Sequence, residues 1–211
     1  MPTKIYSYCT PSHETLLCRH LAPSVPAGFE IVVRRGPQAC EAGCLLRPGW
    51  GTTMRAKIMM IRRALETETS PFVVSDADVR IYNLTPDDVL DMLGDGDVAF
   101  QTTDLSLPPR ACAGFAFLRP VSRVVELYDE VLESLDMLGG SEQRSLCDRA
   151  LPACSPELRV RYLPPSLVWC KAHEPGLAVG SELKAHHACG TWGVNAKIDE
   201  LDAVAKARAS A

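Results

Sequence analysis

The segment Phe72–Ser75 restricts the fold of this 211-residue chain more than any other part of its sequence. It opens with consecutive apolar residues instead of alternating ones, a pattern typical of a strand that is covered on both faces. Pro71 separates it from an amphipathic helix expected over residues 52–68. The apolar positions of that helix are Met54, Ile58, Ile61 and Leu65. A strand buried on both sides next to such a helix indicates a layered α/β fold.

The remainder of the chain continues this alternation of strands and helices. Further strands are expected at residues 4–9, 29–34, 98–101, 114–118 and 159–163. Further helices are expected at residues 85–93, 124–135, 142–151 and 196–209, the first of them with a capping pattern at Thr85-Pro86-Asp87-Asp88. The pattern predicts an α/β/α sandwich with a mainly parallel central sheet. Because no repeat, linker or low-complexity run interrupts it, we expect a single domain over residues 1–211.

Composition and charge argue against several classes of function. The chain is 46% hydrophobic and 23% charged, which is ordinary for a folded domain. A net charge of -4 provides no positive field for nucleic acid or an anionic membrane surface. The apolar runs are too short to cross a bilayer, and the first residues lack the apolar region of a signal peptide. We therefore expect no nucleic-acid partner, no transmembrane segment and a cytoplasmic location.

The cysteines do not form a recognisable framework in the sequence. There are nine, an odd number, and they are scattered along the chain. This is unlike a small secreted disulfide scaffold, so reduced thiols are expected. Cys40 and Cys44 are close enough to join a histidine in a zinc site, but no second pair at zinc-ribbon spacing accompanies them. A structural zinc site is therefore only a minor alternative.

Asp76 and Asp78 directly follow the strand 72–75. Aspartates two positions apart can offer hard oxygen ligands to Mg²⁺ or Mn²⁺ and leave positions for phosphate oxygens. Asp95 and Asp97 have the same spacing but lie in a glycine turn, where solvated turn residues are expected. Placement distinguishes the first pair, since ligands of α/β sheets bind beyond the carboxyl ends of the strands. The alternative for this pair is a strand-ending turn with helix-capping acids.

Several short motifs occur in the order found in a known superfamily. Residues 72–80 resemble the DxD segment of the nucleotide-diphospho-sugar transferase superfamily with the GT-A fold. The other matching segments are Trp50 with the helix carrying Lys57, Ala113-Gly114-Phe115, Glu142-Gln143, and His186-His187-Ala188-Cys189 followed by Gly193 and Lys197-Ile198. The resemblance covers most of residues 4–201 and implies a GT-A-like, Rossmann-like α/β/α sandwich.

The resemblance also implies a metal site for Mn²⁺ or Mg²⁺. Its ligands are Asp76, Asp78 and one of His186 or His187, with His187 favoured because His-Ala-Cys resembles the family's His-Ala-Asn. Asp78 is the firmer ligand, and Asp76 is expected to act partly through water or the donor's ribose. Simple solvation is the alternative for the two histidines.

The same resemblance assigns further residues to the binding of the nucleotide-sugar and to its reacting carbon. The donor-binding residues are Asp76, Ala77, Asp78, Lys57, Gly114 and Phe115. Gln143 and Glu142 are the catalytic candidates, expected to approach the sugar near its reacting carbon. Two departures from the family concern this segment, since Glu142 replaces an Asp and Cys147 stands where Asn is common. Core packing is the alternative for Phe115, and solvation beside the core is the alternative for Lys57, whose amine can extend towards the cleft.

These residues together predict a metal-dependent glycosyltransferase. The resemblance implies transfer of a sugar from a nucleoside diphosphate sugar, with uridine diphosphate favoured, to a hydroxyl of a glycan, lipid or protein, with retention of configuration. Trp169 and Trp192 are candidates for a platform under a sugar ring. One alternative is a non-catalytic nucleotide-sugar-binding module. Another is a phosphotransferase with Asp76 as nucleophile, although that motif usually follows the first strand and is followed by a threonine absent here.

Overall fold

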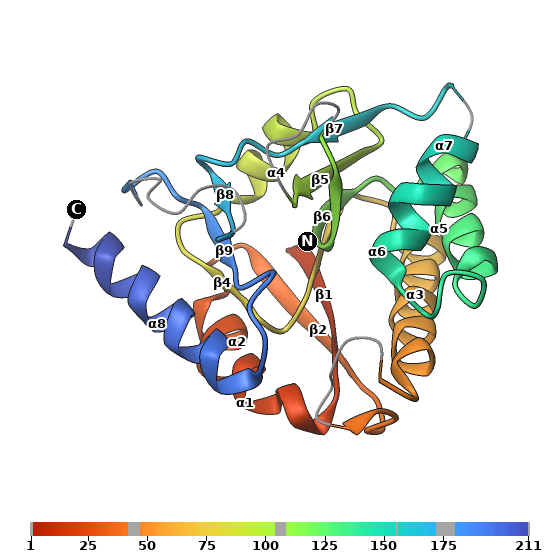
Figure 1. Cartoon of the computed structure of the whole chain (residues 1–211). Helices are drawn as coiled ribbons and strands as arrows, with labels where there is room; N and C mark the ends of the chain where they lie inside the picture. The colour runs from red at the N-terminus through yellow and green to blue at the C-terminus, as the bar shows by residue number, and fades with distance from the viewer. Residues whose placement is uncertain (1, 42–46, 104–108, 155, 172–179, 211) are drawn as a thin grey trace.

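A computed structural model describes residues 2–41, 47–103, 109–154, 156–171 and 180–210 of the chain (Figure 1). Its centre is a six-stranded sheet with the strand order β2-β1-β3-β6-β5-β7. The bounds of these strands are β1 Thr3–Cys9, β2 Phe29–Arg35, β3 Phe72–Ser75, β5 Val98–Thr102, β6 Ala111–Leu118 and β7 Val160–Tyr162. Within this sheet only β6 runs against the other strands. The expectation of a mainly parallel sheet is confirmed.

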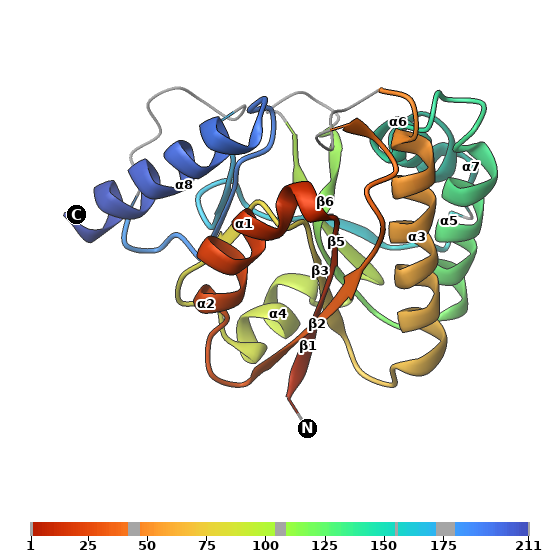
Figure 2. The same cartoon turned by 90° about the horizontal axis from the view of Figure 1, so that it is seen from below.

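Helices cover both faces of the sheet (Figure 2). The larger ones are α3 Trp50–Thr67, α4 Pro86–Leu93, α5 Ser122–Ser134 and α8 Val194–Ala209. Shorter helical segments are η1 Pro11–His13, α1 Glu14–Leu16, η2 Leu17–Leu21, α2 Ala22–Ser24, α6 Glu142–Arg144, η4 Ser145–Ala150 and α7 Leu151–Ala153. Among the described residues, no helix combines the length and apolar character needed to cross a membrane.

The strand residues alternate between two hydrophobic cores because successive side chains of a strand point to opposite faces. One core lies between the sheet and the helices α3 and α5, and the other lies between the sheet and η2 and α4. In β3, Phe72 and Val74 enter the first core and Val73 enters the second. Each of the three is at most 1% exposed. The prediction that this strand is covered on both faces is confirmed.

A second, three-stranded sheet with the order β4-β9-β8 was not expected from the sequence. Its strands are β4 Val79–Ile81, β8 Val168–Trp169 and β9 Ala185–His187. Strands of two or three residues carry too few positions to show a periodicity. No strand was therefore expected at the two histidines, whereas the structure has them on a buried strand beside β4.

Other predicted elements differ from the structure in their details. The strand expected to begin at Gly114 begins at Ala111, and a shift in its pairing with β5 occurs next to Phe100. The helix expected over residues 142–151 is present as α6, η4 and α7 in succession, with π-helical turns in its centre. The capping box of α4 is confirmed, since Thr85 and Asp88 exchange hydrogen bonds between side chain and backbone. Cys44 lies outside the described residues.

The second Asp-x-Asp pair has a structural role that the sequence did not indicate. Asp95 is exposed and pairs with Arg161, but Asp97 is only 1% exposed. The Asp97 carboxylate accepts hydrogen bonds from Arg123 and from both the side chain and the backbone N–H of Arg159. Burial opposes ionisation of Asp97, yet these donors outweigh it and hold its pKa well below the usual range. The expectation of a solvated Asp97 is wrong, because the turn is folded back onto β7 and α5.

The substitution Asp97→Asn tests this role. Removing the charge leaves Arg123 and Arg159 without their partner and should lower the free energy of unfolding at neutral pH by about 2 to 3 kcal/mol. Because the folded-state pKa of Asp97 is depressed, its contribution is present above the unfolded-state pKa of about 4 and is lost as the pH falls below it. Urea denaturation at several pH values measures both effects.

Asp95→Asn is the matched control, since it changes the other acid of the same pair. An exposed ion pair contributes little, so this variant should lie within about 0.5 kcal/mol of the wild-type chain. Equal destabilisation by the two substitutions would contradict a structural role specific to Asp97.

Candidate active site

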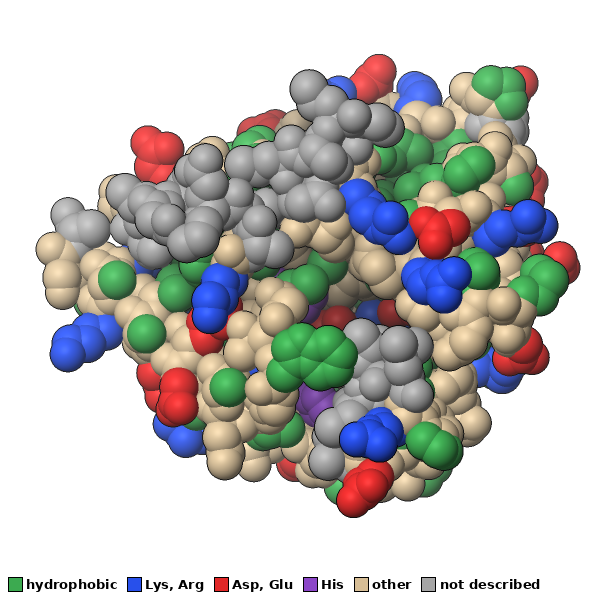
Figure 3. Space-filling view, viewed as in Figure 1, with side chains coloured by type: hydrophobic (Ala, Val, Ile, Leu, Met, Phe, Trp, Pro, Cys, Tyr) green, Lys and Arg blue, Asp and Glu red, His purple; other side chains and the backbone are tan. Residues whose placement is uncertain are grey.

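A pocket of about 390 Å³ opens at the carboxyl ends of β1 and β3. Figure 3 shows the hollow near the centre of one face, with acidic, basic and histidine side chains visible inside it. This is the edge at which α/β sheets bind ligands. The residues that line it include Lys57, Asp76, Ala77, Asp78, Gly114, Glu142, Gln143, His187, Cys189 and Lys197. Most of the predicted site residues are therefore brought together.

Asp76 and Asp78 lie on the short connection between β3 and β4. The Asp76 backbone N–H donates to the Gly114 carbonyl at 2.7 Å, which continues the pairing of β3 with β6. Ala77 is buried, and its side chain packs into the core. Asp78 is also buried, at 4% exposure, although its carboxylate is negatively charged. An ionised carboxylate at such depth requires partners of opposite charge.

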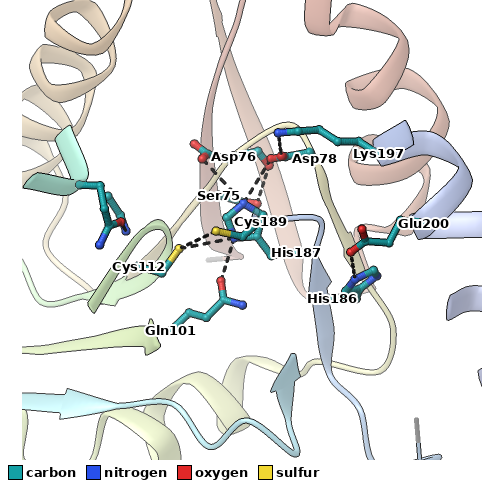
Figure 4. Close-up of polar contacts among 12 residues, drawn as sticks. Ser75, Asp76, Asp78, Gln101, Cys112, His186, His187, Cys189, Lys197 and Glu200 are labelled. Carbon is teal, nitrogen blue, oxygen red and sulfur yellow. Dashed lines mark hydrogen bonds and ion pairs between the residues drawn. The ribbon is translucent and has the colours of Figure 1, made fainter. Parts of the chain in front are cut away.

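His187 meets both aspartates because β9 pairs with β4. His187 lies opposite Val79, and the Ala188 N–H donates to the Asp78 carbonyl at 3.0 Å. The His187 Nε2 atom is 3.4 Å from Asp78 Oδ1 and 3.9 Å from Asp76 Oδ2 (Figure 4). Adjacent ligands of an octahedral cation with bonds of about 2.1 Å are about 3 Å apart, so a modest contraction suits Mg²⁺ or Mn²⁺. These residues are fit to hold a divalent cation.

His186 does not join this cluster, because neighbouring residues of a strand face opposite sides. Its Nε2 atom is 3.1 Å from Glu200 of α8, and its ring packs against Trp169 at 4.8 Å between centroids. Figure 4 shows the two imidazole rings pointing apart. Of the two histidines proposed from the sequence, only His187 faces the aspartates. The Trp169 ring is packed against His186, whereas Trp192 lines the pocket and is 70% exposed.

Lys197 is a functional candidate that the sequence resemblance included without assigning it a role. It lies in the first turn of α8, and its ammonium group forms an ion pair with Asp78 Oδ2. The pocket is also lined by Gly193 and Val194, where α8 begins. The amide groups and dipole at a helix N-terminus favour an anionic ligand. The signal for this arrangement in the sequence was the glycine-rich segment before a helix with an early lysine.

Charges inside the cluster stabilise each other. Burial disfavours a charged His187, but Asp78 outweighs it and raises the pKa of His187 to about 9. Burial likewise opposes ionisation of Asp78, while Lys197 and His187 hold its pKa well below the usual range. At neutral pH without a metal, the His187 ring is therefore protonated on both nitrogens, and the proton on Nε2 faces Asp78. A bound cation would take the place of that proton.

Lys57 is buried beneath the pocket and is already engaged by protein groups. Its Nζ atom lies 2.6 Å from Asp76 Oδ1 and 2.7 Å from Glu142 Oε2, and it donates to the Ala113 carbonyl. The sequence suggested an amine that extends towards the cleft to meet phosphate or base. The structure instead has Lys57 holding Asp76 from below, so that the other oxygen of Asp76 faces His187.

Glu142 shares the charge of Lys57 with Asp76. Burial is the main cause that raises the pKa of Glu142 to about 7, and the nearby Asp76 charge adds to it despite the attraction of Lys57. A single ammonium group thus faces two carboxyl groups, one of which gains a proton near neutral pH. Glu142 is located by Ser141, whose hydroxyl caps α6 by accepting from the Arg144 N–H.

Gln143 lines the pocket, but both ends of its amide are bonded to β6. Its Oε1 atom accepts from the Ala113 N–H at 2.9 Å, and its Nε2 atom donates to the Ala111 carbonyl. Cys147 approaches the same amide at 3.2 Å. The amide is therefore held against the strand rather than presented as a loose side chain.

Gly114 and Phe115 have different surroundings although they are neighbours on β6. Phe115 is fully buried, contacts Phe117 in the core and does not line the pocket, so its predicted contact with the donor is not supported. Gly114 lies at the pocket floor, where a Cβ atom would clash with the His187 ring and lie 2.6 Å from Asp76 Oδ2. The absence of a side chain at residue 114 is what permits Asp76 and His187 to approach each other.

Gly114→Ala should weaken binding of Mn²⁺ because the added methyl group pushes His187 and Asp76 apart. Changes to groups that orient metal ligands cost about 10- to 100-fold in affinity, and a loss of that order is expected. Calorimetric titration with Mn²⁺ measures it. Gly180→Ala is the control, since a Cβ atom there meets none of the described residues closer than 3.9 Å. Unchanged Mn²⁺ affinity in a folded Gly114→Ala variant would contradict the assigned crowding.

The raised pKa of Glu142 predicts a pH-dependent stability. The unfolded chain has a Glu pKa of about 4.3, so ionisation of the buried group destabilises the fold increasingly between about pH 4.3 and about 7, and by a constant amount above. Glu142→Gln removes this term. The stability of the variant relative to the wild type should therefore increase with pH across that interval.

Chemical denaturation at a series of pH values measures this difference, with Glu133→Gln on the exposed face of α5 as the control. A difference between Glu142→Gln and the wild type that stays constant across the interval would contradict the assignment.

The fold of the chain is shared with solved glycosyltransferases. One is a glycosyltransferase involved in the glycosylation of the major capsid of PBCV-1, at 14% identity and a TM-score of 0.67, covering 97% of this chain and 100% of that one. The galactosyltransferase LgtC in complex with donor and acceptor sugar analogs has 11% identity and a TM-score of 0.58, covering 99% and 96%. The bifunctional glycosyltransferase WbbM has 10% identity and a TM-score of 0.54, covering 99% of this chain and 52% of WbbM.

Sequence comparison alone does not reveal this likeness. No protein-family model matches the chain, and no curated protein matches it. The structural neighbours confirm the GT-A-like fold that the ordered motifs implied. At such low identity they show the fold, and the chemistry must be inferred from the residues in the pocket.

Proposed function

We propose that this chain is a metal-dependent glycosyltransferase with one GT-A-like domain. It transfers a sugar from a nucleoside diphosphate sugar, preferentially a uridine diphosphate sugar, to a hydroxyl group of a glycan, lipid or protein. The observation that carries the proposal is the meeting of Asp76, Asp78 and His187 on the floor of a pocket. That pocket lies at the ligand-binding edge of a fold found in glycosyltransferases.

The cation, Mn²⁺ or Mg²⁺, would be held by Asp78, His187 and Asp76. When bound, it supplies a Lewis acid that stabilises the charge on the departing diphosphate. The role of the chain is to fix these ligands before the donor arrives. Lys57 holds one oxygen of Asp76, and the backbone pairing of β9 with β4 holds His187.

The diphosphate is assigned to the beginning of α8. Lys197 can exchange its ion pair with Asp78 for one with a phosphate oxygen once a cation neutralises the carboxylate. The backbone at Gly193 and Val194 adds the positive end of the helix dipole. Charge that grows on the leaving group would thus meet donors already in position.

The sugar would then lie over Glu142 and Gln143. During transfer, the bond between the anomeric carbon and the phosphate oxygen breaks, and the acceptor oxygen bonds to the same carbon. The acceptor proton passes to the departing diphosphate. With retention of configuration, Gln143 would stabilise the developing sugar cation through its amide oxygen. The exposed ring of Trp192 at the pocket is suited to pack against a sugar ring of the acceptor.

One observation favours a second candidate, a nucleotide-sugar-binding module without turnover. Both ends of the Gln143 amide are bonded to β6, and Glu142 is bonded to Lys57. If these contacts persist with donor bound, neither side chain reaches the sugar. Cation and diphosphate would still bind, so this candidate differs from the first in turnover alone.

Asp78→Asn tests the cation site without changing the shape of the side chain. Uridine diphosphate binding to the wild-type chain should require Mn²⁺ or Mg²⁺ and vanish with a chelator, as measured by calorimetry. The variant should lose at least on the order of 100-fold in metal-dependent affinity, because one ligand of the cation is missing. Asp95→Asn, with the same Asp-x-Asp spacing outside the pocket, should bind like the wild type. Metal-dependent binding that survives in Asp78→Asn would refute the assigned site.

A screen of nucleoside diphosphate sugars for transfer or slow donor hydrolysis separates the enzyme from the binding module. Turnover that disappears in Asp78→Asn supports the transferase. Tight, metal-dependent nucleotide binding with no turnover of any donor would favour the module.

A further inference from the structure

Cysteines that are far apart in the sequence meet at the pocket, on the side of His187 away from the aspartates. Cys112 comes from β6, and Cys189 follows β9. Their sulfur atoms are 4.0 Å apart, and Cys112 Sγ is 3.6 Å from His187 Nδ1 (Figure 4). Cys112 is buried, while Cys189 is half-buried, and both line the pocket.

The separations suit a tetrahedral cation. With Zn–S bonds of about 2.3 Å and Zn–N bonds of about 2.0 to 2.1 Å, tetrahedral geometry separates two sulfur ligands by about 3.8 Å and a sulfur from a nitrogen by about 3.5 Å. The observed 4.0 and 3.6 Å need little movement of the side chains. The ligand atoms of Cys112, His187 and Cys189 all lie within 4.8 Å of one another.

We propose that Cys112, Cys189 and His187 Nδ1 form a second metal site, specific for a thiophilic divalent cation such as Zn²⁺. Thiolate and imidazole ligands select zinc over the hard cations that prefer carboxylates. The thiols release their protons to solvent when the cation binds. A water molecule from the pocket or a further thiol would complete the coordination.

The two sites share one imidazole ring, which links their occupancy. A neutral imidazole has one unprotonated nitrogen, and the other nitrogen keeps its proton. When Nε2 serves the carboxylate site, Nδ1–H donates to Gln101 Oε1, which is 2.8 Å away. When Nδ1 serves the thiol site, Nε2–H points to Asp78 and is unavailable to Mn²⁺. Provided the proposed function is correct, Zn²⁺ and Mn²⁺ therefore weaken each other's binding.

Cadmium binding tests the thiol site by itself, because thiolate ligation gives Cd²⁺ an ultraviolet charge-transfer band. The reduced, metal-free chain should show this band on titration, saturating at about one cation per chain, and Zn²⁺ should displace it. Cys112→Ser and Cys189→Ser should each weaken Cd²⁺ binding by more than about 100-fold, since loss of a ligand exceeds the loss of a group that orients one. Because Cys189 is half-buried, its variant remains informative if Cys112→Ser fails to fold.

Cys18→Ser, which changes an exposed thiol outside the pocket, is the control and should retain the band, as should Asp78→Asn. Absence of the band in the reduced wild-type chain, or a band unchanged in Cys189→Ser, would overturn the proposal.

The link between the sites has a separate readout, the affinity for Mn²⁺ followed by electron paramagnetic resonance. Zn²⁺ should lower that affinity in the wild type and have a much smaller effect in Cys189→Ser. A cadmium band without any Mn²⁺ binding would retain the thiol site and refute the carboxylate site. Normal Mn²⁺ binding without the band would do the reverse.

Discussion

The backbone pairing between β4 and β9 is the interaction on which the rest of the pocket depends. It joins segments that are remote in the sequence through Val79 opposite His187 and the Ala188 N–H on the Asp78 carbonyl. This pairing places an imidazole ring against two carboxylates and turns the next residue, His186, to the other side. Beyond β9 the chain continues into α8, whose Lys197 forms an ion pair with Asp78.

Charge balance explains why so many ionisable groups can lie together below the surface. Each carboxylate of the pocket has a cationic neighbour, with Lys57 between Asp76 and Glu142, and with Lys197 and His187 beside Asp78. Such pairs stabilise the ionised forms only as long as the partner remains in place. A cation that displaces the His187 proton leaves Lys197 able to exchange its partner. Binding of a metal ion and a diphosphate would thus replace existing charge pairs in the pocket without leaving a charged group unpaired.

His187 separates two chemical environments at the centre of the pocket. One ring nitrogen faces the hard oxygen atoms of Asp76 and Asp78, and the other faces Gln101 and the Cys112 thiol. The position of a single ring proton therefore decides which environment the residue can serve. Gly114 is part of the same arrangement, since only a residue without a side chain leaves room for the ring next to Asp76.

The sequence by itself determined the order of the main strands and helices, the double burial of β3 and the position of Asp76 and Asp78, because these follow from local periodicity. Ordered motifs extended this to the GT-A-like fold, which the structural neighbours confirm. Only the tertiary structure decided that His187 rather than His186 faces the aspartates, that Asp97 is buried, and that Cys112 meets Cys189. Strands as short as β4, β8 and β9 leave no periodic signal, and contacts between distant segments depend on how those strands pair. Chemistry that arises from such pairing is not encoded in any local spacing of residues.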